Sequence, residues 1–168
     1  LMVSATFTGL IITKFEHALA AQVALTAFIP MLMDTGGNSG SQACVSIIRG
    51  ISLNEIEFRD LGRVVWKEIR VSVLCGVCLA IACFAKIIVV DMLLLKSESV
   101  TYLVAFVVCA TMAVTVCLAK IVGSTLPLLA KKLGFDPAVM ASPIITTIVD
   151  FLSLLVYFAF ATAMLGIG

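Results

Sequence analysis

Long apolar segments separated by short polar connectors dominate the pattern of this chain. Five such segments are expected, the first ending near Lys14 and the others covering residues 18–48, 71–95, 101–130 and 139–167. At a rise of about 1.5 Å per residue, each of the last four can cross a hydrocarbon core of about 30 Å as an α-helix. No segment shows sustained alternation of apolar and polar residues. The pattern therefore predicts an all-α membrane protein, a bundle of five transmembrane helices.

The first apolar segment, Leu1 to Thr13, is too short for a full span of about 20 residues. It has the character of a helix whose beginning is missing, and it carries no charged region typical of a signal peptide. We therefore expect residues 1–168 to form a single transmembrane domain with a truncated first helix, taken from a protein that has soluble parts upstream.

Composition supports a membrane protein. Hydrophobic residues make up 62% of the chain and charged residues only 12%, and the mean hydropathy is +1.21. A soluble domain of this size could not cover its surface with so few polar groups. The net charge of +1 is uninformative, and no sequence feature suggests a nucleic-acid partner. The composition therefore predicts a lipid bilayer as the surroundings. The six cysteines all fall in apolar segments, where buried free thiols are the expected state.

Basic residues are concentrated in two of the predicted connectors. The connector after the second segment carries Arg49, Arg59, Arg63, Lys67 and Arg70, and the one after the fourth carries Lys131 and Lys132. Positive-inside bias places both connectors in the cytoplasm. The prediction is a multi-pass protein of the inner (plasma) membrane with its C-terminus outside. Residues 52–67 mix apolar and charged positions, which predicts a separate amphipathic helix along the cytoplasmic interface with Ser52 as its N-cap.

Asp150 carries the strongest chemical signal in the chain. It lies ten residues after Met140 in the last apolar segment, and no charged residue follows it. A carboxylate near the middle of a bilayer is costly, and such a residue usually faces a water-filled path or a cation. Ser142, Thr146 and Asp150 are spaced four apart and so share one face of the predicted helix. This face indicates a transport domain.

The second segment carries a matching polar face. Asp34, Asn38 and Gln42 recur every four residues, and oxygen-bearing groups on one helix face suit a hydrated hard cation. Three glycines lie among them, at positions 36, 37 and 40. Two interpretations stay open for these glycines, namely tight helix packing or close approach of a hydrated ion to the backbone. If the two polar faces meet, they enclose a polar path.

Two long strings carry a family resemblance. The string from Pro30 to Ala43, Pro-Met-Leu-Met-Asp-Thr-Gly-Gly-Asn-Ser-Gly-Ser-Gln-Ala, is followed by Arg49-Gly50 and closely resembles the second membrane helix of MgtE-type magnesium channels. The string from Ala141 to Asp150 resembles the ion-binding helix of the same family. The likeness covers nearly the whole chain in the number, order and topology of segments.

The resemblance implies more than spacing does. It implies a homodimer with five membrane helices per subunit and a pore at the dimer axis, lined by the second and fifth helices. In that arrangement Asp150 holds hydrated Mg²⁺ in the pore, Thr146 and Ser142 line the same path, and Asp136 joins Mg²⁺ at the cytosolic interface. It also implies cytosolic N and CBS domains that bind Mg²⁺ and close the pore, neither of which is part of this sequence. From the second helix, Asp34, Gly37, Asn38 and Gln42 are the expected pore-lining residues.

Three other functions compete with a magnesium channel. A divalent-cation exchanger driven by Na⁺ or H⁺ needs the same polar path, so the sequence does not separate it from a channel. An intramembrane protease is disfavoured, because the only histidine, His17, lies at an outer boundary, and Asp34 and Asp150 lack the flanking motifs of aspartyl proteases. A purely structural anchor leaves both aspartates unexplained.

Overall fold

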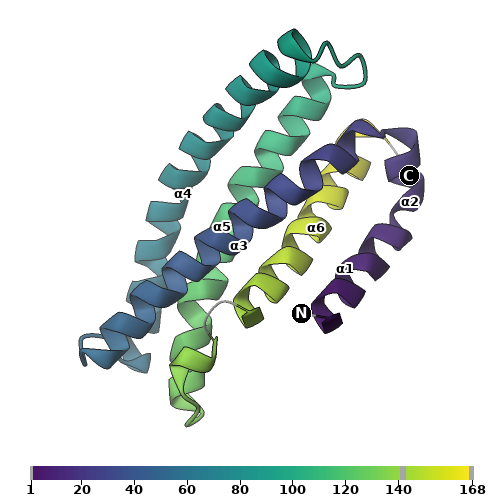
Figure 1. Ribbon diagram of the computed structural model, residues 1–168. Helices are drawn as coiled ribbons and strands as arrows, with labels where there is room; N and C mark the ends of the chain where they lie inside the picture. The colour runs from purple at the N-terminus through teal and green to yellow at the C-terminus, as the bar shows by residue number, and fades with distance from the viewer. Residues whose placement is uncertain (1, 141–142, 167–168) are drawn as a thin grey trace.

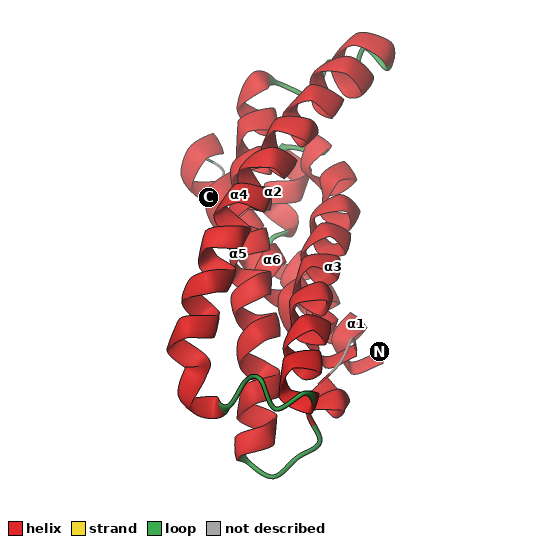
Figure 2. Ribbon diagram, turned by 90° about the vertical axis from the view of Figure 1, so that its left-hand side faces the viewer, coloured by secondary structure: helices red, strands yellow, loops and turns green. Residues whose placement is uncertain are grey.

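The computed structural model describes residues 2–140 and 143–166, and every regular element within them is helical. Figure 2 shows these helices joined by short loops. The predicted all-α fold is confirmed. In chain order the elements are α1 (Met2–Lys14), α2 (Glu16–Ala21), α3 (Ala24–Ser52), the 3₁₀ turn η1 (Phe58–Asp60), α4 (Leu61–Lys86), the π-helical η2 (Ile87–Leu94), α5 (Tyr102–Lys132), the 3₁₀ turn η3 (Pro137–Met140) and α6 (Pro143–Leu165).

Three stretches of the described residues are long and apolar enough to cross a membrane. They are Phe58–Leu94, Tyr102–Lys132 and Pro143–Leu165. Four full spans were expected, and α3 is the one outside this set. Its 29 residues are long enough, but the polar run from Asp34 to Gln42 lowers its hydropathy. The chain is therefore a multi-pass membrane protein whose α3 is marked by polar residues.

The four long helices run up and down beside one another, as Figure 1 shows. Helix α5 packs against α3, α4 and α6, and so occupies the centre of the bundle. Helix α4 lies at one edge with α5 as its main neighbour, and α1 lies against α6 at the other edge. Because α3 and α6 also pack against each other, the two helices with predicted polar faces are direct neighbours.

A buried hydrogen bond ties α6 to the start of α3. The hydroxyl group of Tyr157 donates to the backbone oxygen of Leu25 at 2.9 Å, and both residues are fully buried. Phe28 and Phe158 lie in the same apolar core cluster. A buried phenol needs such a partner, since an unsatisfied hydroxyl group in an apolar core is costly.

The predicted interfacial helix over residues 52–67 is wrong. Ser52 is the last residue of α3, and its hydroxyl group donates to the oxygen of Ile48 at 2.9 Å. The turn that follows is held by Glu57 and Asp60, whose side chains form a reciprocal capping box. This box caps η1, which begins at Phe58, and α4 follows directly from Leu61 as part of the membrane-spanning stretch.

The two basic connectors lie at the same end of the bundle (Figure 1). The ammonium group of Lys132, at the end of α5, lies 4.0 Å from the ring centroid of Phe58 in η1. This cation–π contact joins the α3–α4 connector to the end of α5. The arginine and lysine residues of both connectors are therefore collected on one side of the membrane-spanning region.

Candidate functional site

The polar faces of α3 and α6 meet in a pocket of about 180 Å³. Five of its lining residues were expected at the ion path, and Met33 is an addition. Its lining residues are Met33, Asp34, Gly37, Asn38, Thr146 and Asp150. The i, i+4 spacing on each helix brings these side chains to one place, because α3 and α6 pack side by side.

Two carboxylates provide the charge of this pocket. Asp34 is exposed on the single subunit and Asp150 is half-buried, and the two lie close enough to interact electrostatically. Within residues 2–140 and 143–166, no three His, Cys, Asp or Glu side chains form a metal cluster. The donor set is therefore two carboxylates with the neutral oxygens of Asn38 and Thr146. Such a set suits Mg²⁺, which keeps most of its water and binds through few carboxylates.

Gly37 brings the backbone of α3 close to the acid on α6. A Cβ atom added at Gly37 would lie 3.3 Å from Cγ2 of Thr146 and 3.8 Å from Oδ1 of Asp150. Any side chain here would therefore fill the pocket from the α3 side. The sequence left open whether the glycines serve helix packing or the approach of a hydrated ion to the backbone. The position of Gly37 at the pocket fits the second interpretation.

Gly36 and Gly40 have a different environment. A Cβ atom at Gly36 would lie 2.7 Å from Cγ2 of Thr115, and one at Gly40 would lie 3.1 Å from the backbone oxygen of Ala119. Both glycines are buried and allow α3 to pack tightly on α5. For these two positions helix packing is the observed role.

The hydroxyl group of Thr146 is held within its own helix. It donates to the backbone oxygen of Pro143 at 3.2 Å, and the hydroxyl group of Thr147 donates to the same oxygen at 2.7 Å. A threonine oxygen that donates its only proton still has lone pairs that accept hydrogen bonds. Thr146 can therefore accept a hydrogen bond from a water molecule in the pocket.

A second pocket continues the polar face along α3 toward the basic end of the bundle. Its volume is about 510 Å³ and it contains Gln42, as the four-residue spacing predicted. Ser41 and Ser46 also line this pocket, although they were not predicted. Helical spacing could have indicated both, because Ser41 lies three residues after Asn38 and Ser46 lies four residues after Gln42. Its lining residues are Asn38, Ser41, Gln42, Val45 and Ser46.

Of the remaining expected site residues, Asp136 lies outside these pockets. Asp136 precedes η3 in the connector between α5 and α6, where its Oδ1 accepts a hydrogen bond from the backbone of Ala138 at 2.9 Å. It is exposed at the basic end of the bundle, away from Asp150. Ser142 lies outside the described residues.

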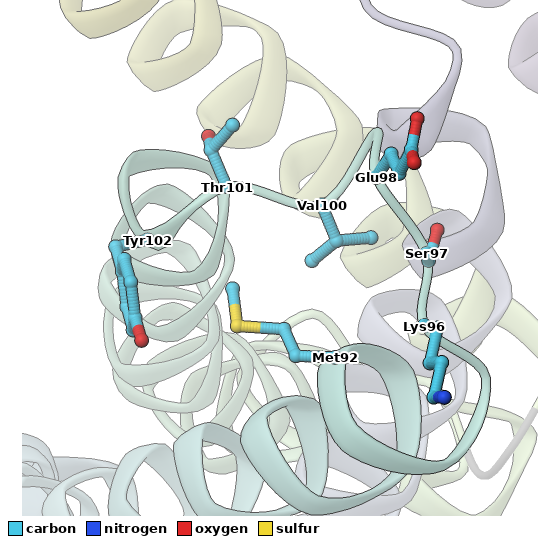
Figure 3. A pocket seen from close by; sticks show the side chains of 7 residues that line it. All are labelled: Met92, Lys96, Ser97, Glu98, Val100, Thr101 and Tyr102. Carbon is cyan, nitrogen blue, oxygen red and sulfur yellow. The ribbon is translucent and has the colours of Figure 1, made fainter.

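A further pocket of about 510 Å³ lies in the connector between η2 and α5, at the opposite end of the bundle. Figure 3 shows Met92 and Val100 pointing into the opening, with Lys96 and Glu98 pointing away from each other. Its lining comes from a single segment, residues 92–102. The apolar interior and the outward charges make it a hollow in a loop, not a counterpart of the carboxylate pocket.

Comparison with known families points to cation transport. Residues 29–160 match the family model MgtE, described as divalent cation transporter. This range contains the whole carboxylate pocket and the second pocket along α3.

Curated relatives are similar over nearly the entire chain. The magnesium transporter MgtE of Bacillus subtilis (strain 168) is 36% identical over 158 residues, which is 94% of this chain and 33% of the relative. The magnesium transporter MgtE of Thermus thermophilus is 33% identical over 165 residues, which is 98% of this chain and 35% of the relative. The chain thus spans about a third of the length of the curated relatives it matches.

Proposed function

Because this chain belongs to the MgtE family of divalent cation transporters, we propose that it forms the ion-conducting membrane domain of a magnesium channel. Hydrated Mg²⁺ is the transported substrate, and its path follows the polar faces of α3 and α6. The observation that carries the proposal is the pocket in which Asp34 and Asp150 meet beside Gly37.

The chemistry of the pocket fits a hydrated divalent cation. Mg²⁺ gives up water reluctantly. A path for it must therefore supply negative charge and also neutral oxygen groups that hydrogen-bond to the water molecules around the ion. Asp34 and Asp150 supply negative charge, while Asn38 and Thr146 supply neutral oxygens. Without a cation the two carboxylates repel each other, so the ion stabilises the site it enters.

The direction of the path follows from the second pocket. From the carboxylate pocket, Asn38 leads to Ser41, Gln42 and Ser46 along α3, toward the end that carries the arginine-rich connector. Positive-inside bias assigns this end to the cytoplasm. The proposed location is the plasma membrane, with the C-terminus on the outer side.

A second copy of the chain would complete the path. On one subunit Asp34, Asn38 and Gln42 are exposed, so the polar face of α3 is not covered by the other helices of the same subunit. Two subunits related by a two-fold axis would place two such faces opposite each other and enclose a hydrated ion. We therefore propose a homodimer with α3 and α6 at its axis.

The remaining length of the relatives leaves room for regulation. The resemblance implies cytosolic N and CBS domains that bind Mg²⁺ and close the pore, and the curated relatives are about three times as long as the matched region. Asp136 is exposed at the basic end of the bundle, where such domains would lie. We propose it as a Mg²⁺ ligand at that junction, together with Ser142 and Thr146 as residues of the path.

None of the three competing functions is proposed. A purely structural anchor leaves Asp34 and Asp150 unexplained. The family is one of transporters and not of enzymes, so the intramembrane protease is set aside. Coupled exchange with Na⁺ or H⁺ is not proposed, because no observation on the described residues favours it over a channel.

The decisive test replaces Asp150 in the full-length protein. Asp150→Asn keeps the shape of the side chain and removes its charge, so Mg²⁺ influx into proteoliposomes should fall by about tenfold or more, since a buried charge-assisted contact contributes about 1.5–3 kcal/mol. Glu98→Gln, a charge removal in the exposed loop at the opposite end, is the matched control and should conduct normally. Normal influx through the Asp150→Asn variant would refute the assignment.

The dimer requires its own experiment. A cysteine at Thr146, in a protein whose six native cysteines have been replaced, should form a crosslink between subunits, and Mg²⁺ should slow its formation. A monodisperse monomer that conducts Mg²⁺ in liposomes would contradict the proposed assembly.

A further inference from the structure

Helix α4 carries a basic stripe that the ion path does not use. Arg63, Lys67 and Arg70 follow one another at intervals of three or four residues, with Trp66 between them, and all four residues are exposed. This spacing places them on one face of the helix. We refer to Arg63, Trp66, Lys67 and Arg70 as the basic stripe.

The basic stripe faces away from the rest of the bundle. The opposite face of α4 is buried through Val64, Glu68 and Ser72, and α5 is the main neighbour of this helix. Figure 1 shows α4 at the edge of the molecule, on the far side from α1 and α6. The stripe is therefore remote from the proposed two-fold axis.

The same helix face continues into the membrane. Beyond Arg70, the exposed positions on this face are apolar, and they lie at the same helical spacing. They are Leu74, Val77, Ile81 and Phe84, with exposures of 68%, 51%, 66% and 41%. A face of exposed aliphatic and aromatic side chains on a membrane-spanning helix is covered by lipid tails. The basic stripe thus continues the lipid-facing surface of α4 toward the lipid headgroups.

The length of the helix places the stripe at the headgroup level. The helical stretch from Phe58 to Leu94 has 37 residues. Its α-helical part, the 26 residues of α4, is alone about 39 Å long at 1.5 Å per residue, whereas the hydrocarbon core is about 30 Å thick. Residues 71–94, α-helical up to Lys86 and π-helical beyond it, are long enough to fill the core. Trp66 is 63% exposed, and tryptophan is enriched at the membrane–water interface.

The positive charge of the stripe is largely uncompensated. In the described part of the chain, neither Lys67 nor Arg70 has an acidic side chain within ion-pair distance. Arg63 reaches Asp60 only at 3.6 Å and keeps 88% of its side chain exposed. Three exposed cations at headgroup level beside a lipid-facing surface attract anionic lipid headgroups.

We propose that the basic stripe binds the phosphate group of an anionic phospholipid, such as phosphatidylglycerol, in the leaflet at this end of the bundle. Arg63, Lys67 and Arg70 contact the phosphate, the ring of Trp66 packs at the glycerol level, and the acyl chains lie along Leu74 and Val77. The site needs α4 to cross the membrane, but it is independent of the ion path.

The test compares lipids around Trp66 in the full-length protein. In phosphatidylcholine vesicles, a minor amount of brominated phosphatidylglycerol should quench the fluorescence of Trp66 more strongly than the same amount of brominated phosphatidylcholine. The part of the signal that belongs to Trp66 is obtained by subtracting the Trp66→Phe variant. Each basic residue near an anionic surface contributes about 1 kcal/mol, or about fivefold. The triple variant Arg63→Gln, Lys67→Gln, Arg70→Gln should therefore lose the preference by about tenfold or more.

Two controls separate charge from position. A second triple variant, Lys14→Gln, Lys96→Gln, Lys131→Gln, removes the same number of charges at exposed sites elsewhere and should keep the preference. The charge-conserving variant Arg63→Lys, Lys67→Arg, Arg70→Lys should also keep it.

Three results would overturn the proposal. The first is equal quenching by both brominated lipids in the unmodified protein. The second is displacement of phosphatidylglycerol by inorganic phosphate, which would make the stripe a site for a soluble anion. The third is an unchanged lipid preference in the first triple variant combined with altered protease cleavage of the cytosolic regions, which would assign the stripe to a protein partner.

Discussion

Gly40 of α3 and Gly123 of α5 meet backbone to backbone, with the carbonyl oxygen of Gly40 in the place that a Cβ atom on Gly123 would occupy. One turn earlier on α5, the backbone oxygen of Ala119 would lie 3.1 Å from a Cβ atom on Gly40. This crossing sets the distance between α3 and the central helix of the bundle. The carboxylate pocket lies on the other side of the same stretch of α3, so the crossing supports its position.

Gly123→Ala should destabilise the folded protein. The added methyl group collides with backbone and not with a flexible side chain, so the two helices must separate, and overpacking of this kind costs about 1–3 kcal/mol. The measurement is the free energy of unfolding in detergent micelles. Gly62→Ala is the control, because nothing lies within 4 Å of a Cβ atom there. Equal stability of the two variants would show that the crossing tolerates a wider spacing.

Gly37→Leu should reduce Mg²⁺ influx because it obstructs the path or disturbs the packing of α3 on α6, where a Cβ atom would already lie 3.3 Å from Cγ2 of Thr146. Its side chain would extend past Thr146 into a pocket of about 180 Å³, where it displaces water that a hydrated ion needs. Influx into proteoliposomes and the unfolding free energy are measured on the same preparation. The proposal fails at this position if influx stays normal, and Gly62→Leu provides the matched control for both measurements.

A cysteine at Asn38 should react with water-soluble thiol reagents in a protein whose native cysteines have been replaced. Asn38 lines both polar pockets along α3, so a water-filled path must pass it. Mg²⁺ should slow the reaction because it occupies the same space. A cysteine at Leu74, which lies on the lipid-facing side of α4, should remain unreactive. No reaction at position 38 under any ion condition would exclude this face from the path.

The buried ion pair between Glu68 of α4 and Lys120 of α5 should behave as a unit. Their charged atoms lie 3.7 Å apart, and the side chains are only 11% and 12% exposed. Removing one partner leaves an uncompensated charge in the bundle, so Glu68→Gln or Lys120→Met alone should cost about 3 kcal/mol. The double variant Glu68→Gln, Lys120→Met should cost less than the sum of the two single variants, as unfolding measurements on all four proteins will reveal. Additive losses would contradict a direct pair.

Much of the candidate site is visible in the sequence. Asp34 and Asn38 on one helix, and Thr146 and Asp150 on another, follow from four-residue spacing and from the presence of acids in apolar segments. Met33 gave no such signal, since it is an ordinary apolar residue of an apolar helix. Its place in the pocket depends on how far α3 is rotated about its axis, and that rotation is set by contacts with α5 and α6.

Some helix boundaries could be predicted from the sequence and others could not. The ends of α1 and α5 agree with the sequence prediction within about two residues, because apolar runs end there at charged residues. The start of α4 does not agree with the prediction. Ser52 and Glu55 have the pattern of a helix start, but Ser52 is the last residue of α3 and Glu55 lies in the connector that follows. The capping box of Glu57 and Asp60 forms in the structure instead. In the sequence, its pattern is no stronger than that of Ser52 and Glu55.

The sequence by itself determined that this protein is helical, that it belongs in a membrane and that it carries acids there, because segment length, hydropathy and periodicity are local properties. Only the tertiary structure decided that Gly37 lies at the carboxylate pocket beside Asp150 whereas Gly36 and Gly40 lie in the packed contacts of α3 with α5 and α6, and that Glu68 pairs with Lys120. These relationships join residues far apart in the chain. They depend on the rotation and spacing of packed helices, which the spacing of residues within a single segment does not specify.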